Sequence, residues 1–175
     1  ILHLNTLQRL VLGARTNSQQ DAARALHGLL ERGGFAPVLS QDIQQEMWEK
    51  FVFLTTYAGM TTLMRAPIGA ILQAEDGEAL VRQMLAECVA TAAASGHIPS
   101  QAAHARMLAT LTERGSTGTA SMLRDLQRGG ATEHEHIIGD MLRRARDARL
   151  DAPLLRVSLA HMQACDATRA AGVGA

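Results

Sequence analysis

The first part of the chain alternates short apolar runs with one amphipathic segment. Residues 1–13, ILHLNTLQRLVLG, predict two short strands joined by a turn, since apolar runs flank a polar stretch. A helix should follow, capped by Asn17 or Ser18 and stopped by the glycines at 33–34. Residues 35–40, FAPVLS, predict one more strand. A set this small leaves its sheet edges unpaired and its faces uncovered, so we expect it to be the tail of a larger α/β domain.

From Ser40 onward the apolar positions recur only with helical period. Ser40 is the expected cap of a long helix that runs to about Met64, and the proline in RAPIG, residues 65–69, should end it. Further helices are expected at residues 75–96, 99–114, 120–130, 131–150 and 151–170, with a loop at 115–119. The predicted fold is therefore mainly α, with a short α/β piece at residues 1–39 and an all-helical domain at 40–175.

Composition excludes several classes of protein. Hydrophobic residues make up 47% of the 175 residues and charged residues 19%, which is enough to bury a core. The net charge is zero and there is no basic stripe, so nucleic acid is not an expected partner. The apolar runs are too short to span a membrane, and we expect no signal peptide. Cys88 and Cys165 lack a CxxC spacing, so we expect two reduced thiols in a cytoplasmic protein.

Lys50 stands in the most aromatic stretch of the chain, MWEKFVFLTTYAGM, which begins at residue 47. Its neighbours on its own helical face are apolar: Met47, Phe53, Leu54 and Tyr57. A helix that is apolar all round is expected in the core, and its lysine then has two interpretations. Either the side chain extends its ammonium to the surface beside Glu46, or it ends in a cleft, where a partly desolvated ammonium becomes a proton donor near neutral pH.

The segment TEHEH begins at Thr132 and holds the second candidate. Thr132 and Glu135 have the spacing of a capping box, which leaves Glu133 at the first helical position without a capping role. Its carboxylate there either interacts favourably with the positive helix terminus or belongs to a functional site. His134 and His136 point to different sides of a helix, so no metal site is expected.

Ser121 opens a helix after the loop GSTGT, and such a serine by itself has a capping or back-bonding role. The loop is not a phosphate-binding loop, because no GK[ST] follows it. The chain also contains no G-x-G-x-x-G. The chain alone is therefore not expected to bind a dinucleotide by a glycine-rich turn.

Several segments share one family pattern. They are ILHL and LVLG near the start, MWEKF with its lysine, and SMLRDLQRGGATEHEHIIGDMLRRAR followed by DAP. Together they resemble the ketopantoate reductase (2-dehydropantoate 2-reductase) family over nearly the whole chain. The family has S-M-x-x-D, then T-E with an aliphatic residue and a glycine on the same helix. The chain matches this pattern at Ser121, Asp125, Thr132, Glu133 and Gly139.

The resemblance implies a two-domain enzyme that uses NADPH to reduce a small 2-oxo acid such as ketopantoate. A Rossmann-type domain, with residues 1–39 as its tail, would bind NADPH. An all-helical domain of the 6-phosphogluconate-dehydrogenase-like type would close the substrate site. Lys50 matches the catalytic lysine, Ser121 a substrate-binding serine and Glu133 a cofactor-binding glutamate.

The same resemblance implies a cytoplasmic protein of pantothenate and coenzyme A biosynthesis, and it allows a homodimer through the helical domain. The isolated chain is expected to be inactive, because it lacks most of a cofactor domain.

Two positions depart from the family pattern. Family members often carry asparagines four and eight residues after the lysine, where this chain has Leu54 and Ala58. Thr55, Thr61 or Thr62 could replace them, but from other angles of the helix. Three alternatives stay open: reduction of ketopantoate, reduction of a bulkier or less polar 2-oxo acid, or a helical interaction module without catalysis, whose lysine only reaches the surface.

Overall fold

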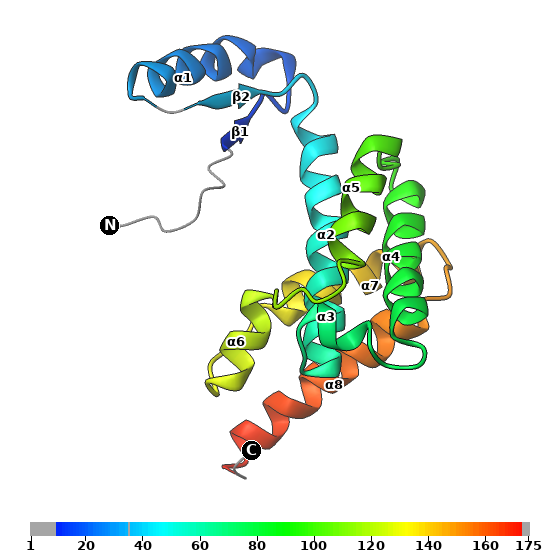
Figure 1. Cartoon of the computed structure of the whole chain (residues 1–175). Coiled ribbons are helices and arrows are strands. Elements are labelled where there is room, and N and C mark those ends of the chain that lie inside the picture. The colour runs from blue at the N-terminus through cyan, green and yellow to red at the C-terminus, as the bar shows by residue number, and fades with distance from the viewer. Residues whose placement is uncertain (1–9, 35, 173–175) are drawn as a thin grey trace. The chain divides into compact units, whose positions relative to one another are not determined.

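The computed structural model describes residues 10–34 and 36–172. The chain divides into two compact units, Ile1–Met47 and Trp48–Ala175, each with its own internal packing. The described part is mainly helical, as predicted, with one two-stranded sheet (Figure 1). Within that part no helix is both long and apolar enough to cross a membrane.

The first unit is a strand-helix-strand arrangement. Strand β1 (Leu10–Leu12) pairs in parallel with β2 (Pro37–Leu39), as Figure 1 shows. A parallel pair needs a crossover connection, and here helix α1 (Gln20–Arg32) supplies it after the 3₁₀ turn η1 (Asn17–Gln19). The predicted helix and last strand are confirmed. The strand and turn predicted at the very start of the chain fall within residues 1–9, outside the described residues.

Apolar side chains remain uncovered in this unit. On the strands, Leu10 is 42% exposed and Val38 is 44% exposed, and on α1 both Leu26 and Leu29 are exposed. Parallel sheets are normally buried on both faces. The first unit therefore carries the kind of surface that is found inside an α/β domain.

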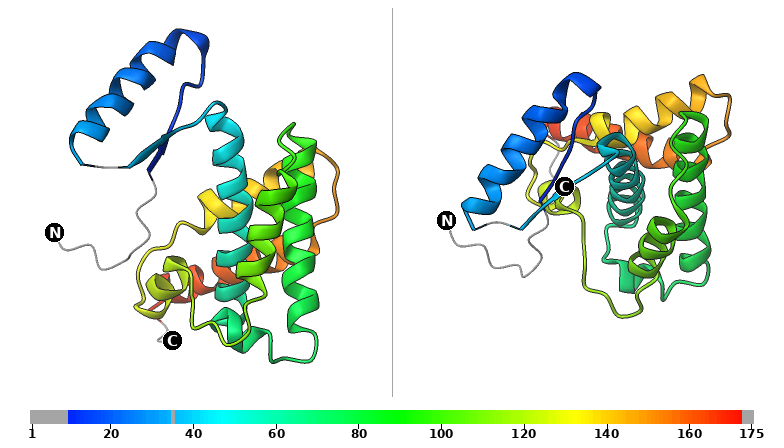
Figure 2. Two further views of the ribbon diagram at one scale, coloured as in Figure 1. Left: turned by 45° about the horizontal axis from the view of Figure 1, so that its top comes forward. Right: turned by 90° about the horizontal axis from the view of Figure 1, so that it is seen from above.

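The second unit is a bundle around helix α2 (Ile43–Met64), which begins in the first unit. Its other elements are α3 (Ile68–Ile71), α4 (Gly77–Ala94), α5 (Gln101–Leu111), α6 (Ser121–Gln127), the π-helical turn η2 (Glu135–Gly139), α7 (Asp140–Asp147) and α8 (Pro153–Ala170). Helices α4 and α5 run beside α2, and α8 crosses the bundle (Figures 1 and 2). The predicted helices are confirmed in outline, with two exceptions. The short α3 was not predicted, and the helix expected at residues 131–150 is interrupted by η2.

Two predicted helix caps are wrong. Asn17 and Ser18 do not cap α1, because both lie in the preceding η1 turn. The α2 helix is capped by Asp42 rather than Ser40: Asp42 Oδ1 accepts the Gln45 N–H at 3.0 Å. The Ser40 hydroxyl instead accepts the Asp42 N–H at 3.2 Å and shapes the turn that leads into the helix.

The carboxyl-terminal half of α2 forms the centre of the core. Three of the four threonine hydroxyls on this half donate to helix carbonyls one turn earlier: Thr56 to Val52, Thr61 to Tyr57 and Thr62 to Ala58. The fourth, on Thr55, is buried without a partner among the described residues. Buried hydroxyls need such partners. Thr61 and Thr62 are therefore bonded within their own helix and do not replace the missing asparagines. Thr55 does not replace them either, because its side chain is fully buried.

The amino terminus of α8 is held by a carboxylate from a distant helix. Glu87 on α4 is only 8% exposed, and its two oxygens accept the N–H groups of Leu154 and Leu155 at 3.1 and 3.0 Å. Gln83 donates a further hydrogen bond to Glu87 at 3.2 Å. No residue near α8 in sequence caps its first turn, so this long-range carboxylate does so.

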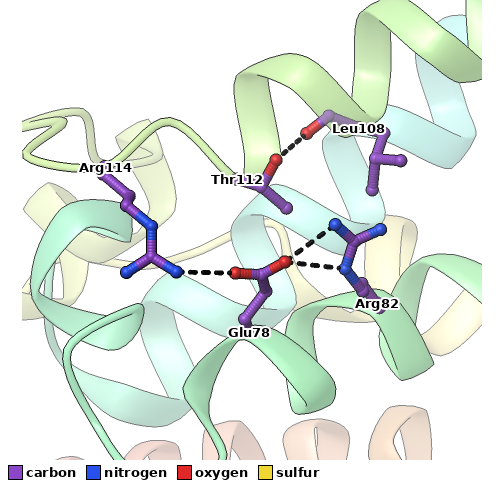
Figure 3. A network of polar contacts seen from close by, with 5 residues as sticks. All are labelled: Glu78, Arg82, Leu108, Thr112 and Arg114. Carbon is purple, nitrogen blue, oxygen red and sulfur yellow. Dashed lines mark hydrogen bonds and ion pairs between the residues drawn. The ribbon is translucent and has the colours of Figure 1, made fainter.

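A surface network joins α4 to the segment that follows α5 (Figure 3). The carboxylate of Glu78 pairs with Arg82 at 2.7 Å and with Arg114 at 3.2 Å. The hydrogen bonds from Arg82 hold the pKa of Glu78 below its usual value, although partial burial acts the other way. Because the three side chains are solvated, the network contributes little to stability.

Both cysteines are free, as expected. Cys88 is fully buried on α4, and burial raises the pKa of its thiol to about 12. Cys165 on α8 is half-buried, with its sulfur 3.8 Å from His161 Nε2. Cys88 is therefore a packing residue without thiolate chemistry at neutral pH.

Candidate functional site

Lys50 lies in the second turn of α2 and is exposed. It is the only lysine in a chain that has 17 Lys and Arg residues. Within the described part of the chain its ammonium takes part in no hydrogen bond or ion pair. The expectation that α2 is buried all round is wrong for this half of the helix, since Met47 is 57% exposed and Leu54 is 37% exposed.

The other side of this half of α2 faces the bundle. Trp48 stacks on His97 with ring centroids 5.1 Å apart, and the Arg144 guanidinium lies 5.0 Å from the centroid of the same indole. Glu49 Oε1 accepts the N–H of Ser100, the residue that caps α5. These contacts fix the rotation of α2, and Lys50 consequently points away from the bundle.

Two aromatic rings continue the Lys50 face along the helix. Phe53 and Tyr57 stack with centroids 5.5 Å apart and planes 18° from parallel. Both rings are half-buried. Burial raises the pKa of Tyr57 above its usual value, Arg124 opposes this shift, and Glu113 adds to it. The Lys50 ammonium is thus followed by an apolar strip that ends in a protonated phenol.

The Tyr57 hydroxyl reaches the loop that leads to Ser121. A side chain at Gly118 would collide with this hydroxyl, so a larger residue there would require the Tyr57 ring to move. The loop is also bound to the start of α3, where Ile68 N–H donates to Gly118 O at 3.2 Å and Gly69 N–H donates to Ser116 O at 2.9 Å. Through Tyr57 the Lys50 face of α2 therefore contacts the residues just before Ser121.

Ser121 is the first residue of α6 and is exposed. The expected capping or back-bonding role is not observed, since within the described residues its hydroxyl makes no hydrogen bond. Arg124, one turn on, donates to the Thr119 carbonyl at 2.9 Å and closes the loop onto the helix. The Ser121 hydroxyl is thus available to a ligand.

The predicted capping box around Glu133 is wrong. The Thr132 hydroxyl and His134 Nδ1 are 2.8 Å apart and share a hydrogen bond, while Glu135 accepts from Gln163 Nε2 at 2.7 Å. Glu133 itself is exposed, and only its backbone carbonyl bonds into the following turn. Its carboxylate has no partner in the described part of the chain.

Lys50, Ser121 and Glu133 all belong to the second unit, and all three are exposed. No hydrogen bond or ion pair between described residues joins any two of them. Their arrangement around one cleft stays a prediction. No group of three or more histidine, cysteine or acidic residues in the described chain is placed to hold a metal ion.

Three residues that shape this region were missed from the sequence. Gly118 had a visible signal, because a glycine inside a polar loop often marks a close approach. Buried Glu87 had none, since its partners lie on another element, and buried His134 had none, since its hydrogen bond to Thr132 takes the place of the predicted capping box.

Known proteins of similar sequence are oxidoreductases. An uncharacterised oxidoreductase, YkpB, from Bacillus subtilis (strain 168) is 28% identical over 97% of this chain and 56% of its own length. A 2-dehydropantoate 2-reductase from Halobacterium salinarum is 29% identical over 71% of this chain and 41% of its own length. The chain thus spans about half the length of the curated relatives it matches.

Solved structures of oxidoreductases have a similar fold. A PanE/ApbA family ketopantoate reductase from Ralstonia eutropha JMP134 matches with a TM-score of 0.80 at 21% identity, covering 93% of this chain and 53% of that one. D-mandelate dehydrogenase, solved with NADH and anilino(oxo)acetate, matches with a TM-score of 0.78 at 17% identity, covering 93% of this chain and 68% of that one. At these identities the matches show the fold.

The family model described as "Ketopantoate reductase PanE/ApbA C terminal" matches residues 42–165, which is most of the chain. This match covers α2 through most of α8, the elements that carry Lys50, Ser121 and Glu133. The chain therefore belongs to the ketopantoate reductase PanE/ApbA C-terminal family.

Proposed function

We propose that this chain is the substrate-binding part of an NADPH-dependent 2-oxo acid reductase in which Lys50 is the proton donor. The observation that carries the proposal is the state of Lys50: the only lysine of the chain, exposed and unpaired beside an apolar strip. An arginine cannot give up its proton near neutral pH, whereas a lysine can. A lysine is therefore the cation that proton transfer requires here.

In the proposed reaction the keto oxygen of the substrate lies against Lys50 Nζ. NADPH, when bound, supplies the hydride that adds to the keto carbon. As that C–H bond forms, the carbonyl electron pair moves to oxygen, and Nζ–H gives its proton to that oxygen to complete the 2-hydroxy acid. Water then reprotonates the amine. The ammonium stabilises negative charge where it develops, which lowers the transition state more than the ground state.

Ser121 is proposed to hold the substrate carboxylate. Its hydroxyl is free, exposed and three residues after Gly118, which the Tyr57 hydroxyl touches. A serine hydroxyl can donate to a carboxylate oxygen. Because the carboxylate of a 2-oxo acid is bonded to its keto carbon, the proposal requires the Ser121 hydroxyl and Lys50 Nζ to meet at the same end of the substrate, with the rest of the substrate along the Phe53–Tyr57 strip.

Glu133 is proposed to bind the cofactor. Its exposed carboxylate has no partner among the described residues, so it can accept hydrogen bonds from ribose hydroxyls, and such an acceptor fits a nucleotide. The pyrophosphate needs a glycine-rich turn that this sequence does not contain. The β1–α1–β2 unit, with Leu10 and Val38 uncovered, supports an NADP-binding domain whose sheet it would extend.

The side chain at position 54 favours a substrate with an apolar substituent. Leu54 is 37% exposed, one turn after Lys50 on the same face, where an asparagine would grip a hydroxyl-bearing substrate. Ala58 is 4% exposed and packs in the core, so the second family asparagine has no room to act. We therefore propose 2-oxo acids with bulky apolar side chains as substrates ahead of ketopantoate. A homodimer formed through the helical domain stays a prediction.

The test uses the protein that carries this chain together with its NADP-binding domain. Its NADPH oxidation is measured with ketopantoate and with branched and aromatic 2-oxo acids. We expect the apolar 2-oxo acids to have the higher kcat/KM, and Leu54→Asn to shift preference toward ketopantoate. If the folded protein reduces none of these acids, the result would instead support the alternative of a helical interaction module without catalysis.

A further inference from the structure

A buried histidine stands beside the proposed cofactor residue. His134 is 4% exposed, although its sequence neighbours Glu133 and Glu135 are both exposed. A histidine in a core needs partners for both ring nitrogens. The proton-transfer reaction proposed above does not use this ring, so its burial calls for another explanation.

Both ring nitrogens of His134 have polar neighbours, one of which, Asp166, lies on α8. Nδ1 shares a hydrogen bond with the Thr132 hydroxyl at 2.8 Å, and Thr132 lies in the segment that precedes η2. Nε2 lies 3.8 Å from Asp166 Oδ2 on α8 and 3.7 Å from Glu135 Oε1. Asp166 is held in turn by Arg169 at 3.0 Å. The ring thus forms a hydrogen bond to the entering segment, and its other nitrogen lies close to α8 but beyond hydrogen-bond distance of it.

The turn that follows is built around a second contact to α8. Glu135 Oε1 accepts from Gln163 Nε2 at 2.7 Å, and a Cβ at Gly139 would lie 2.8 Å from Glu135 Oε2. A larger residue at this position would therefore require the Glu135 carboxylate to move from its place in the π-helical turn. Such turns are rare and often occur at functional sites. Thr132 and His134, on either side of Glu133, thus bond to each other, and Glu135 bonds to α8, whereas Glu133 itself is exposed.

We propose that His134 is a positioning residue that fixes Glu133 for binding NADPH. Its hydrogen bond to Thr132 holds the backbone on both sides of Glu133, and Glu135 ties the same segment to α8, so that the Glu133 carboxylate meets the cofactor in one orientation. This inference rests on the proposed cofactor role of Glu133. It predicts that His134 acts on cofactor affinity and not on the chemical step.

The experiment compares three substitutions in the complete protein. His134→Leu keeps the apolar volume and removes both polar contacts, His134→Asn keeps an amide near the Nδ1 position, and exposed His136→Asn is the matched control. NADPH dissociation constants are measured by calorimetry without substrate, alongside kcat and KM for NADPH. We expect His134→Leu to weaken NADPH binding about tenfold, which corresponds to roughly 1.4 kcal/mol, with kcat at saturating NADPH nearly unchanged. His134→Asn should recover much of the affinity, and the control should match the wild type.

A packing role would give the opposite order, with leucine tolerated and asparagine harmful, and that order would overturn the inference. If His134→Leu does not fold, Thr132→Val tests the same Nδ1 contact from outside the core and should also weaken NADPH binding. Unchanged affinity in Thr132→Val would then overturn the inference. Glu133→Gln separates the two proposals. If it leaves NADPH affinity unchanged, the cofactor role of Glu133 is wrong. If it weakens binding while folded His134→Leu does not, only the positioning role is wrong.

Discussion

Replacing Glu87 should destabilise the helical unit more than any nearby surface carboxylate. The Glu87→Ala variant loses the acceptor for the N–H groups of Leu154 and Leu155. Leu155 is fully buried, so water cannot replace the acceptor at its N–H. One buried unpaired donor costs about 1–3 kcal/mol, and loss of a helix cap adds about 1 kcal/mol. We therefore expect a loss of about 2–4 kcal/mol in the free energy of unfolding.

The assay is urea unfolding followed by the fluorescence of Trp48, the only tryptophan, which lies in the same unit. Glu87→Gln is the matched variant, because it keeps one carbonyl oxygen at the helix terminus and should lose about half as much. Glu78→Gln serves as the surface control and should change little. A Glu87→Ala variant as stable as the wild type, or a less stable Glu87→Gln, would show that this carboxylate does not hold α8.

Three further predictions follow from single residues. Tyr57 is the only tyrosine, so its ionisation can be followed by ultraviolet absorbance, and the midpoint should lie above the ordinary pKa of 10.0. Because the pKa is raised in the folded state, the contribution of Tyr57 to stability is complete below pH 10.0 and is lost as the pH rises through the folded-state pKa. A midpoint at or below 10.0 would contradict its burial. A thiol reagent should modify Cys165 in the folded chain and Cys88 only after unfolding, and equal rates would show that Cys88 is accessible. Arg149 follows the end of α7 with φ of 57°, a left-handed conformation that costs less for glycine than for arginine. Arg149→Gly should therefore stabilise the fold by about 1 kcal/mol and raise the midpoint of thermal unfolding. A lower midpoint would show that the arginine side chain makes a stabilising contact.

Local signals in the sequence predicted most helices correctly. Ser100 has a capping side chain at the start of α5, and Gly96, with φ of 85°, follows α4. The cap of α2 was misassigned because Ser40 and Asp42 are both good caps, and their sequence alone does not rank them. Helix ends can therefore be predicted to within one helical turn, because the residues that determine them are neighbours along the chain.

Interactions between distant segments could not be predicted in the same way. Glu87 is bound to residues 67 and 68 positions away, and nothing in its own helix indicates that contact. The π-helical turn depends on Gly139, Glu135 and Gln163 together. The sequence left both interpretations of Lys50 open and wrongly predicted its helix face to be buried, because an apolar helix face looks the same in sequence whether it packs on its own chain or remains open.

The most direct measurement of the proton-donor role is the turnover of the complete enzyme with Lys50→Arg and Lys50→Ala. Both should lower kcat by roughly a hundred- to ten-thousand-fold with a smaller effect on NADPH binding, because arginine keeps the charge but not the transferable proton. Circular dichroism and NADPH calorimetry show that the variants are folded and loaded. If Lys50→Arg keeps full turnover, the side chain contributes charge only. If Lys50→Ala also turns over every accepted substrate at the wild-type rate, Lys50 is an exposed surface residue and the account of catalysis is wrong.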